Sequence, residues 1–328
     1  MFRKTSIALA TIVAVFTGHI QTLSAETISP DALVSAGELT VCLPRNGGVI
    51  AGRRLTGGSG FDYRVSNAIA EQLGLPLNII WIENDLDEES DPVRETYAML
   101  AHRLCDAIPG HPRYEGAVGV SDYDRASLPR WLGMPQEIDP DTNLLKDSLA
   151  GFVDVEPVAV TGGYMRTQIG LVYRDDTAEP IGLDDLQNRR LALQQGTLSG
   201  AIATLQVAPV DRALLKMMNP GAGFLWEVEN QNLPLAIVDV PAFDAHLKAN
   251  PFTPLRLAAW RHAVGMDIGI AVLAENTVLI EVLDAVIADL LASGQLPQFA
   301  EEEGMTYSAP VSSDLAPRFT LETLREAR

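Results

Sequence analysis

Short apolar runs alternate with helical patterns of apolar and polar residues along the chain from Glu38 onward. A run of about four to eight apolar residues predicts a buried strand, and apolar residues spaced three or four apart predict one face of a helix. Their repeated alternation is typical of β-α-β units around a mainly parallel sheet. Strands are predicted at residues 39–43, 77–82, 105–108, 158–160, 168–173, 190–194, 235–238 and 269–273, and helices at 61–73, 93–104, 183–186, from about 198, at 241–248 and at 278–293.

Residues 113–157 interrupt this pattern. Proline, glycine and aspartate are scattered through the segment, and no strand or helix period runs through it. We expect an irregular excursion with one short helix. Loops of this length usually carry function or move, so the excursion is a candidate docking surface for a partner protein.

The first 25 residues predict a cleavable signal peptide. Arg3 and Lys4 give a positive start, residues 6–16 form a short apolar stretch, and Ala25 offers a small residue for cleavage. We therefore expect export to the periplasm. An uncleaved anchor is the alternative, although the apolar stretch is shorter than the roughly 18 residues of a membrane helix. Charged residues interrupt every later apolar run, so the mature protein is predicted not to be embedded in a membrane.

The chain is strongly acidic, with 24 lysine and arginine residues, 43 aspartate and glutamate residues and a formal net charge of −19. Nucleic-acid binding depends on cations that neutralise phosphates, so a nucleic-acid partner is excluded. The acidity favours solubility, and steering toward a basic partner is the other interpretation. About 300 mature residues exceed what one hydrophobic core usually organises, which predicts two lobes.

The chain contains two cysteines, Cys42 and Cys105. In an oxidising compartment an even number of cysteines favours a disulfide, and here the bond would join two predicted strands. A metal pair of His102 and Cys105 is the alternative, but two further ligands at useful spacing are missing. We expect the disulfide and no metal site.

Two positions at the ends of predicted strands are candidates for ligand binding. Gly196 and Thr197 lie where a strand meets a helix, and free N–H groups there favour an anion such as a carboxylate. Asp239 follows the strand at 235–238, at the edge of the sheet where α/β proteins bind ligands, and its carboxylate suits a cation or a hydroxyl. Each position also has a purely structural interpretation as a turn or a helix cap.

Several enzyme and cofactor patterns are absent from the sequence. The glycine-rich loop at residues 47–60 lacks the ending of a phosphate loop and the spacing of a dinucleotide fingerprint. The acidic run that begins at Asp85 has Ser90 and Thr96 where a calcium loop needs glycine and glutamate. No His-Glu-x-x-His or Gly-x-Ser-x-Gly motif occurs. We expect a binding protein rather than an enzyme, and no cofactor.

The order and spacing of these elements resemble the family 3 solute-binding proteins of ABC transporters. The matching segments are 39–43, 60–62 with the helix to Gly74, 104–106, 163–174 around Tyr164, 181–197, 236–240 and 269–272 with its long helix and Gly294. The resemblance implies an α/β, two-lobed type II periplasmic-binding fold. Lobe 1 would comprise residues 26–164 and the return segment 259–328 with its tail, and lobe 2 residues 165–258.

Ligands of this family bind between the lobes, which implies roles for individual residues here. Thr197 matches the position that binds a carboxylate, and Asp239 matches the acid that takes an amino group. The family's carboxylate-binding Thr-x-x-Arg motif is not evident after Gly110, so Arg113 and Arg125 are candidate substitutes. The candidate ligand-binding residues are Arg113, Tyr164, Gly196, Thr197 and Asp239. The resemblance implies closure of the lobes on a small polar ligand, either amino-acid-like or a carboxylate.

A narrower similarity suggests a different partner. A cysteine in the first strand, the step Leu104-Cys105-Asp106 and the sequence Gly110-His111-Pro112 are similar to the subgroup associated with quinoprotein alcohol dehydrogenases, which includes the methanol-oxidation J proteins. This similarity implies an accessory protein that binds a periplasmic alcohol dehydrogenase instead of an ABC permease.

Overall fold

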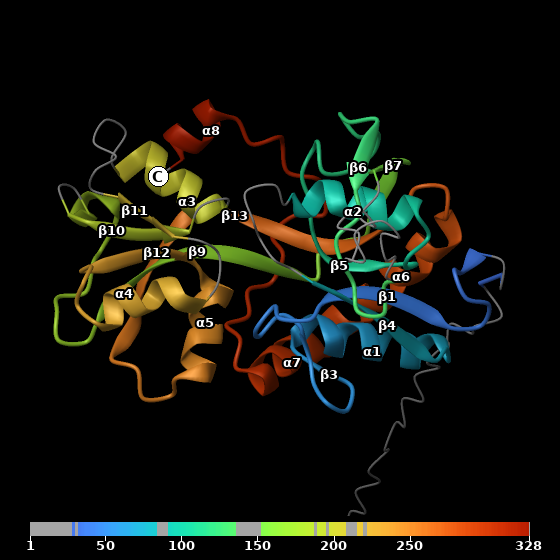
Figure 1. Cartoon of the computed structure of the whole chain (residues 1–328), viewed down its shortest axis with the longest axis horizontal. Coiled ribbons are helices and arrows are strands. Elements are labelled where there is room, and N and C mark those ends of the chain that lie inside the picture. Colours follow the sequence, from blue (N-terminus) through green and yellow to red (C-terminus); the bar gives the residue numbers. More distant parts are fainter. Residues whose placement is uncertain are drawn as a thin grey trace, which may run out of the picture.

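Two lobes joined by a pair of long strands make up the computed structural model (Figure 1). It describes residues 28–29, 32–83, 91–135, 152–186, 189–194, 197–207, 215–218 and 222–327. The predicted signal peptide lies outside these residues. Among the described helices, none has the length and apolar character needed to cross a bilayer.

Lobe 1 contains elements from both ends of the chain. Its strands are β1 (Leu39–Pro44), β2 (Gly52–Arg53), β3 (Gly58–Ser59), β4 (Leu77–Ile82), β5 (Ile108–Pro112), β6 (Arg125–Ser127), β7 (Phe152–Asp154) and β8 (Val158–Val160). Its helices are α1 (Phe61–Leu73), α2 (Pro92–Ala101), α6 (Thr277–Ser293) and α7 (Gln295–Glu303). The predicted helices at 61–73 and 278–293 are confirmed, and each ends at a left-handed glycine, Gly74 and Gly294.

The other elements of lobe 2 come, in the sequence, between the two long strands that join the lobes. Its strands are β10 (Leu191–Gln194), β11 (Leu215–Met218) and β12 (Leu235–Asp239). Its helices are α3 (Leu198–Ile202), which continues as a π-helix at Ala203–Val207, α4 (Trp226–Glu229), α5 (Val240–Ala249) and two 3-10 helices at Leu183–Leu186 and Ala222–Leu225. The last helix of the chain, α8 (Leu321–Glu326), packs on α3 and the π-helix.

The strands β9 (Met165–Arg174) and β13 (Leu255–Leu273) pair antiparallel and run through both lobes (Figure 1). In lobe 1, β13 also pairs with β5 and β8, and in lobe 2 β9 pairs with β12. The pairs β1–β4, β10–β11 and β10–β12 are parallel. The expected α/β architecture is therefore present, with antiparallel pairing where the chain crosses between lobes.

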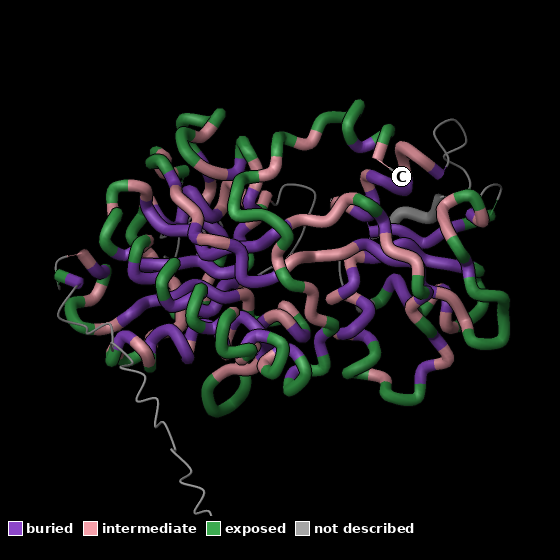
Figure 2. The backbone as a smooth tube through the Cα atoms, turned by 180° about the vertical axis from the view of Figure 1, so that it is seen from behind, coloured by how far each residue is buried: buried purple, intermediate pink, exposed green. Residues whose placement is uncertain are grey.

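The hydrophobic cores follow the same division. In lobe 1, α1 and α6 bury faces that include Val65, Ile69 and Leu283 against the sheet. In lobe 2, a separate cluster includes Ile169, Leu193 and Ile237. Figure 2 shows the buried backbone concentrated along the strands of each lobe, with exposed residues around the outside. Each lobe thus has its own core, as the length of the chain predicts.

The disulfide between Cys42 and Cys105 is confirmed, with a Cα–Cα distance of 5.7 Å. The prediction of a strand at residues 105–108 is wrong by several residues, because β5 begins at Ile108 and Cys105 lies in the turn before it. That turn contributes only an isolated bridge between Val41 and Ala107. The bond therefore joins β1 to the segment that leads into β5.

Two other expectations differ from the structure, and a third lies almost wholly outside the described residues. The predicted strand at 269–273 is the last part of the 19-residue β13. The excursion contains the hairpin β6–β7 and no helix among its described residues, while 136–151 lie outside the description. The acidic run from Asp85 falls almost wholly in the undescribed residues 84–90.

Candidate functional site

A chain of side-chain hydrogen bonds forms the candidate site of lobe 2. The Thr197 hydroxyl lies 2.9 Å from the Ser199 hydroxyl, which donates to Asp239 Oδ2 at 2.8 Å. Thr197 caps α3 by accepting from the Gly200 N–H at 3.1 Å, and Asp239 is the last residue of the buried strand β12. Two adjacent parallel strands, β10 and β12, end at the same edge of the sheet, which brings these residues together.

The Asp239 carboxylate does not cap the helix that follows it. Asp239 is the N-cap residue of α5, but its side chain makes no cap hydrogen bond and is bonded to Ser199 instead. Burial raises the pKa of Asp239 to about 6, against the opposing effect of the Ser199 hydrogen bond. The Asp239 carboxylate thus belongs to the hydrogen-bonded chain of Thr197 and Ser199 and not to the cap of α5.

A cavity of about 710 Å³ is lined by residues of both lobes. Thr197 and Leu198 contribute the wall from lobe 2, and α2 contributes Arg94 and Tyr97 from lobe 1. The remaining lining residues are Asp91, Pro92, Val93, Gly110, Pro112, Tyr114, Gly116, Ser121, Asp122, Tyr123, Met266, Arg318 and Phe319. We call this space the interlobe cavity. Its volume suits a small organic ligand.

Two buried donors of the interlobe cavity have no hydrogen-bond partner within the described part of the chain. They are the Nε of Arg94 and the hydroxyl of Tyr97, which lie three residues apart on one face of α2. Arg94 is otherwise held by a bond from its Nη2 to the Arg125 carbonyl at 3.2 Å and by the Tyr123 ring, 3.9 Å from its Cζ. Buried polar groups in folded proteins are nearly always hydrogen-bonded, so these two donors are candidates for bonds to a ligand.

A second polar group lies in lobe 1 beside the interlobe cavity. The Tyr164 hydroxyl donates to Asp62 Oδ1 at 2.7 Å and accepts from the Gly110 N–H at 2.8 Å. Asp62 lines an adjacent cavity of about 220 Å³, and Gly110 lines both. Burial raises the pKa of Asp62 to about 7, against the Tyr164 hydrogen bond, and also raises the pKa of Tyr164. Tyr164 is fully buried, and among the described residues its hydroxyl forms hydrogen bonds with Asp62 and Gly110 only.

Arg113 lies away from this group. Its guanidinium donates to three backbone carbonyls, those of Thr161 at 2.8 Å, Ser312 at 3.0 Å and Ser313 at 2.8 Å. The residue is 5% exposed and lines a different cavity, beside Asp267 and the C-terminal segment. Arg125 is on β6, where it pairs with Asp154 at 3.1 Å.

The structure therefore groups some of the predicted residues and separates others. Thr197 and Asp239 are brought together through Ser199, while Tyr164 lies in lobe 1 and Arg113 holds the C-terminal segment. Gly196 lies outside the described residues. The sequence interpretation missed Ser199, Arg94 and Tyr97. The available signals were the hydroxyl of Ser199, two residues after Thr197, and the spacing of three residues between Arg94 and Tyr97 on a predicted helix.

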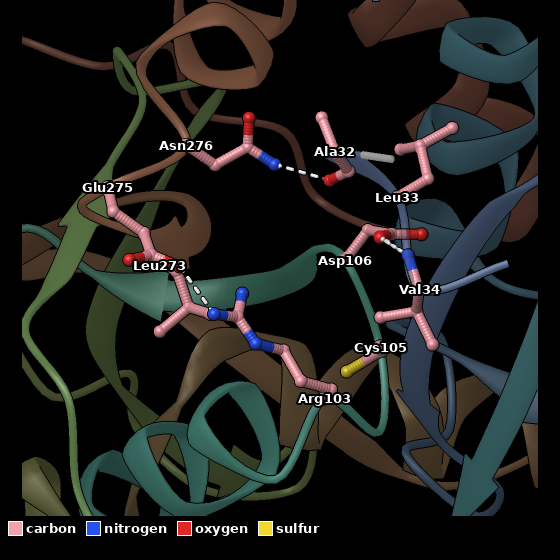
Figure 3. A pocket seen from close by; sticks show the side chains of 9 residues that line it. All are labelled: Ala32, Leu33, Val34, Arg103, Cys105, Asp106, Leu273, Glu275 and Asn276. Carbon is pink, nitrogen blue, oxygen red and sulfur yellow. Dashed lines mark hydrogen bonds and ion pairs between the residues drawn. The ribbon is translucent and has the colours of Figure 1, made fainter. Parts of the chain in front are cut away.

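A further cavity of about 560 Å³ lies on lobe 1 beside the disulfide and does not reach lobe 2 (Figure 3). Its polar groups are already paired: Arg103 with Glu275, Asp106 Oδ1 with the Val34 N–H at 2.6 Å and Asn276 Nδ2 with the Ala32 carbonyl at 2.8 Å. In the described part of the chain, no cluster of three or more possible metal-ligating side chains occurs.

No protein-family model matches the chain, and no curated protein matches it. Its likeness is to solved structures. An ancestral cationic amino acid solute-binding protein is 16% identical with a TM-score of 0.56, over 84% of this chain and 99% of that protein. A histidine kinase sensor domain with similarity to periplasmic binding proteins is 17% identical with a TM-score of 0.55, over 83% and 98%.

A third likeness is to an amino acid ABC transporter substrate-binding protein from Streptococcus pneumoniae, bound to L-arginine. It is 17% identical with a TM-score of 0.53, over 84% of this chain and 96% of that protein. Identities this low carry the architecture alone. The fold is thus the two-lobed type II periplasmic-binding fold that the resemblance implies.

Proposed function

We propose that this chain is a periplasmic solute-binding protein that closes two lobes on a small polar ligand bearing a carboxylate, for an ABC transporter. The observation that carries the proposal is the interlobe cavity, to which both lobes contribute polar side chains. Similarity to solute-binding proteins in solved structures supports the proposal at the level of the fold.

The chemistry of the cavity walls supports an anionic ligand group on the side of lobe 1. Arg94 Nε and the Tyr97 hydroxyl are donors that lack acceptors among the described residues, and a carboxylate accepts two such bonds at once. On the side of lobe 2, Thr197 lines the same cavity, and its hydroxyl donates to the Gln194 carbonyl at 3.0 Å and lies 2.9 Å from the Ser199 hydroxyl. Asp239, through Ser199, fixes that hydroxyl and adds negative charge for an amino group or a hydroxyl of the ligand.

Binding of this kind needs no covalent step. A ligand that touches both lobes has a higher affinity for the closed form, and that difference in affinity drives closure about the crossing strands β9 and β13. We infer that a permease then recognises the closed form. The signal peptide and the periplasmic location belong to the same proposal.

The test is the melting temperature of the mature protein against a panel of amino acids, small carboxylates, amines and alcohols. A carboxylate-bearing compound should raise the melting temperature of the wild type and of Arg125→Ala, whose side chain is 59% exposed on β6. The rise should be lost in Arg94→Ala. No rise with any compound, or an equal rise in all three proteins, would exclude the proposed site.

The narrower sequence similarity supports a second candidate function, binding to a periplasmic quinoprotein alcohol dehydrogenase. The observation that favours it is a group of exposed apolar side chains on the excursion, including Val120 at 81% and Phe152 at 58% exposure. Affinity capture with a purified dehydrogenase tests this candidate. Loss of capture in the double variant Val120→Asp with Phe152→Asp would favour dehydrogenase binding over solute binding, provided that no compound of the panel raises the melting temperature of the wild type.

A further inference from the structure

The C-terminal segment leaves lobe 1, passes along the boundary between the lobes and ends on lobe 2 (Figure 1). We call residues 306–327 the C-terminal strap. Figure 2, seen from behind, shows much of it exposed on the surface. At its start, the Thr306 N–H donates to Asp244 Oδ2 of α5 at 2.7 Å, so the strap touches lobe 2 at once.

The middle of the strap is fixed to lobe 1 and the crossing strands. Asp267 Oδ2 on β13 accepts from the N–H groups of Val311 and Ser312, each at 3.1 Å. The Arg113 guanidinium donates to the carbonyls of Ser312 and Ser313. Ala316 forms a β-bridge with Tyr114, and the Ala316 N–H donates to the Arg113 carbonyl at 3.0 Å. The buried position of Arg113 is therefore explained by the strap.

The end of the strap is fixed to lobe 2. Leu324 is 7% exposed and belongs to the apolar cluster that includes Ile169 and Ile202, and Phe319 packs against the same cluster. Gln206, in the π-helix, donates from Nε2 to the carbonyls of Leu324 and Ala327, the latter at 2.6 Å. One buried leucine and two hydrogen bonds form a small anchor, which is suited to detachment.

The strap also forms part of the wall of the interlobe cavity. Arg318 and Phe319 line the cavity together with Thr197 and Leu198. Arg318 pairs with Asp122, and the Phe319 ring lies 5.5 Å from the ring of Tyr114, both on lobe 1. The strap residues that line the cavity are thus close in sequence to those that join the strap to lobe 2.

We propose that the C-terminal strap is a latch between the lobes, and that the lobes separate fully only when α8 leaves lobe 2. Hinge opening moves lobe 2 away from lobe 1, and a segment bonded to both must release one of them. The contacts of α8 with lobe 2 are one buried leucine and two hydrogen bonds from Gln206, so release is placed there. The idea that this release also admits the ligand rests on the proposed function. The limit on lobe separation does not.

The experiment measures the distance between the lobes in the mature chain without ligand. Spin labels are attached at Ala178→Cys on lobe 2 and Ala285→Cys on lobe 1, both exposed, and pulsed electron–electron double resonance gives the distance. The native cysteines are joined to each other and do not take label. Leu324→Asp should shift the distances to larger values, whereas Leu321→Asp, on the exposed side of α8 at 66%, should not.

A chain ending at Pro317 provides the second variant, since it lacks Phe319 and all of α8. Circular dichroism melting first establishes that both lobes are folded. Longer distances in this variant support the latch even where Leu324→Asp leaves α8 bound. Unchanged distances in both variants, or an equal increase in Leu321→Asp, would overturn it. Because no ligand is added, failure of the latch is distinct from failure of the proposed function.

Discussion

Replacement of Asp62 by asparagine should remove a large part of the pH dependence of stability. Asp62 is 1% exposed and accepts a hydrogen bond from Tyr164, and burial raises its pKa from the ordinary value of 3.8 to about 7. Between these two values the folded protein binds a proton that the unfolded chain has lost. Stability therefore falls as the pH rises through this range.

The magnitude follows from the two pKa values. A tenfold change in proton affinity corresponds to ~1.4 kcal/mol. The difference between 3.8 and about 7 thus gives a loss of about 4 kcal/mol at pH values above the folded pKa. Asparagine keeps an oxygen that accepts from Tyr164 and carries no charge to bury, so Asp62→Asn should be more stable than the wild type at high pH.

The assay is urea unfolding of the wild type and of Asp62→Asn from pH ~4 to ~8, because the slope of stability against pH measures the difference in bound protons. Asp289→Asn, which removes an exposed carboxylate on α6, is the matched control. The difference in free energy of unfolding between Asp62→Asn and the wild type should grow with pH and level off above about pH 7. A constant difference across the range would refute the argument that burial of the charged Asp62 is costly.

Further predictions concern the disulfide and the hydrogen-bonded chain of lobe 2. Cys42→Ala with Cys105→Ala should lower the free energy of unfolding by about 4 kcal/mol, since the bond joins residues 63 apart, and reduction of the wild type in urea should give a similar loss. Ser199→Ala should cost ~1 to 3 kcal/mol, more above pH ~6 than below it, because the charged Asp239 loses its donor; melting at two pH values measures this. Asp239→Ala should leave the circular dichroism spectrum unchanged and abolish any ligand-induced rise in melting temperature.

Local patterns predicted much of the fold, because they depend on residues close in sequence. The helix 61–73 repeats apolar residues at helical spacing and stops at Gly74, and β12 is a continuous apolar run. The length of β13 was not predictable in this way. Its first part, from Leu255, mixes buried and exposed residues without alternation as the strand passes between lobes.

The candidate site was predicted only where strand ends define it. Thr197 and Asp239 follow apolar strands, and the parallel pairing of β10 and β12 makes them neighbours. Arg94 was not evident, since its three-residue spacing from Tyr97 does not by itself distinguish it from an exposed arginine on a helix. Arg113 was a reasonable carboxylate ligand by residue type, but its partners are carbonyls, two of which lie about 200 residues later in the chain. No sequence pattern predicts a contact between residues so far apart in the chain.

The most direct test of the central claim is a crystal structure of the protein grown with the compound that raises its melting temperature most. The account predicts electron density in the interlobe cavity, with a carboxylate bonded to Arg94 and Tyr97 and contact to Thr197 on the other side. A ligand bound outside this cavity, or one that touches a single lobe, would contradict the account.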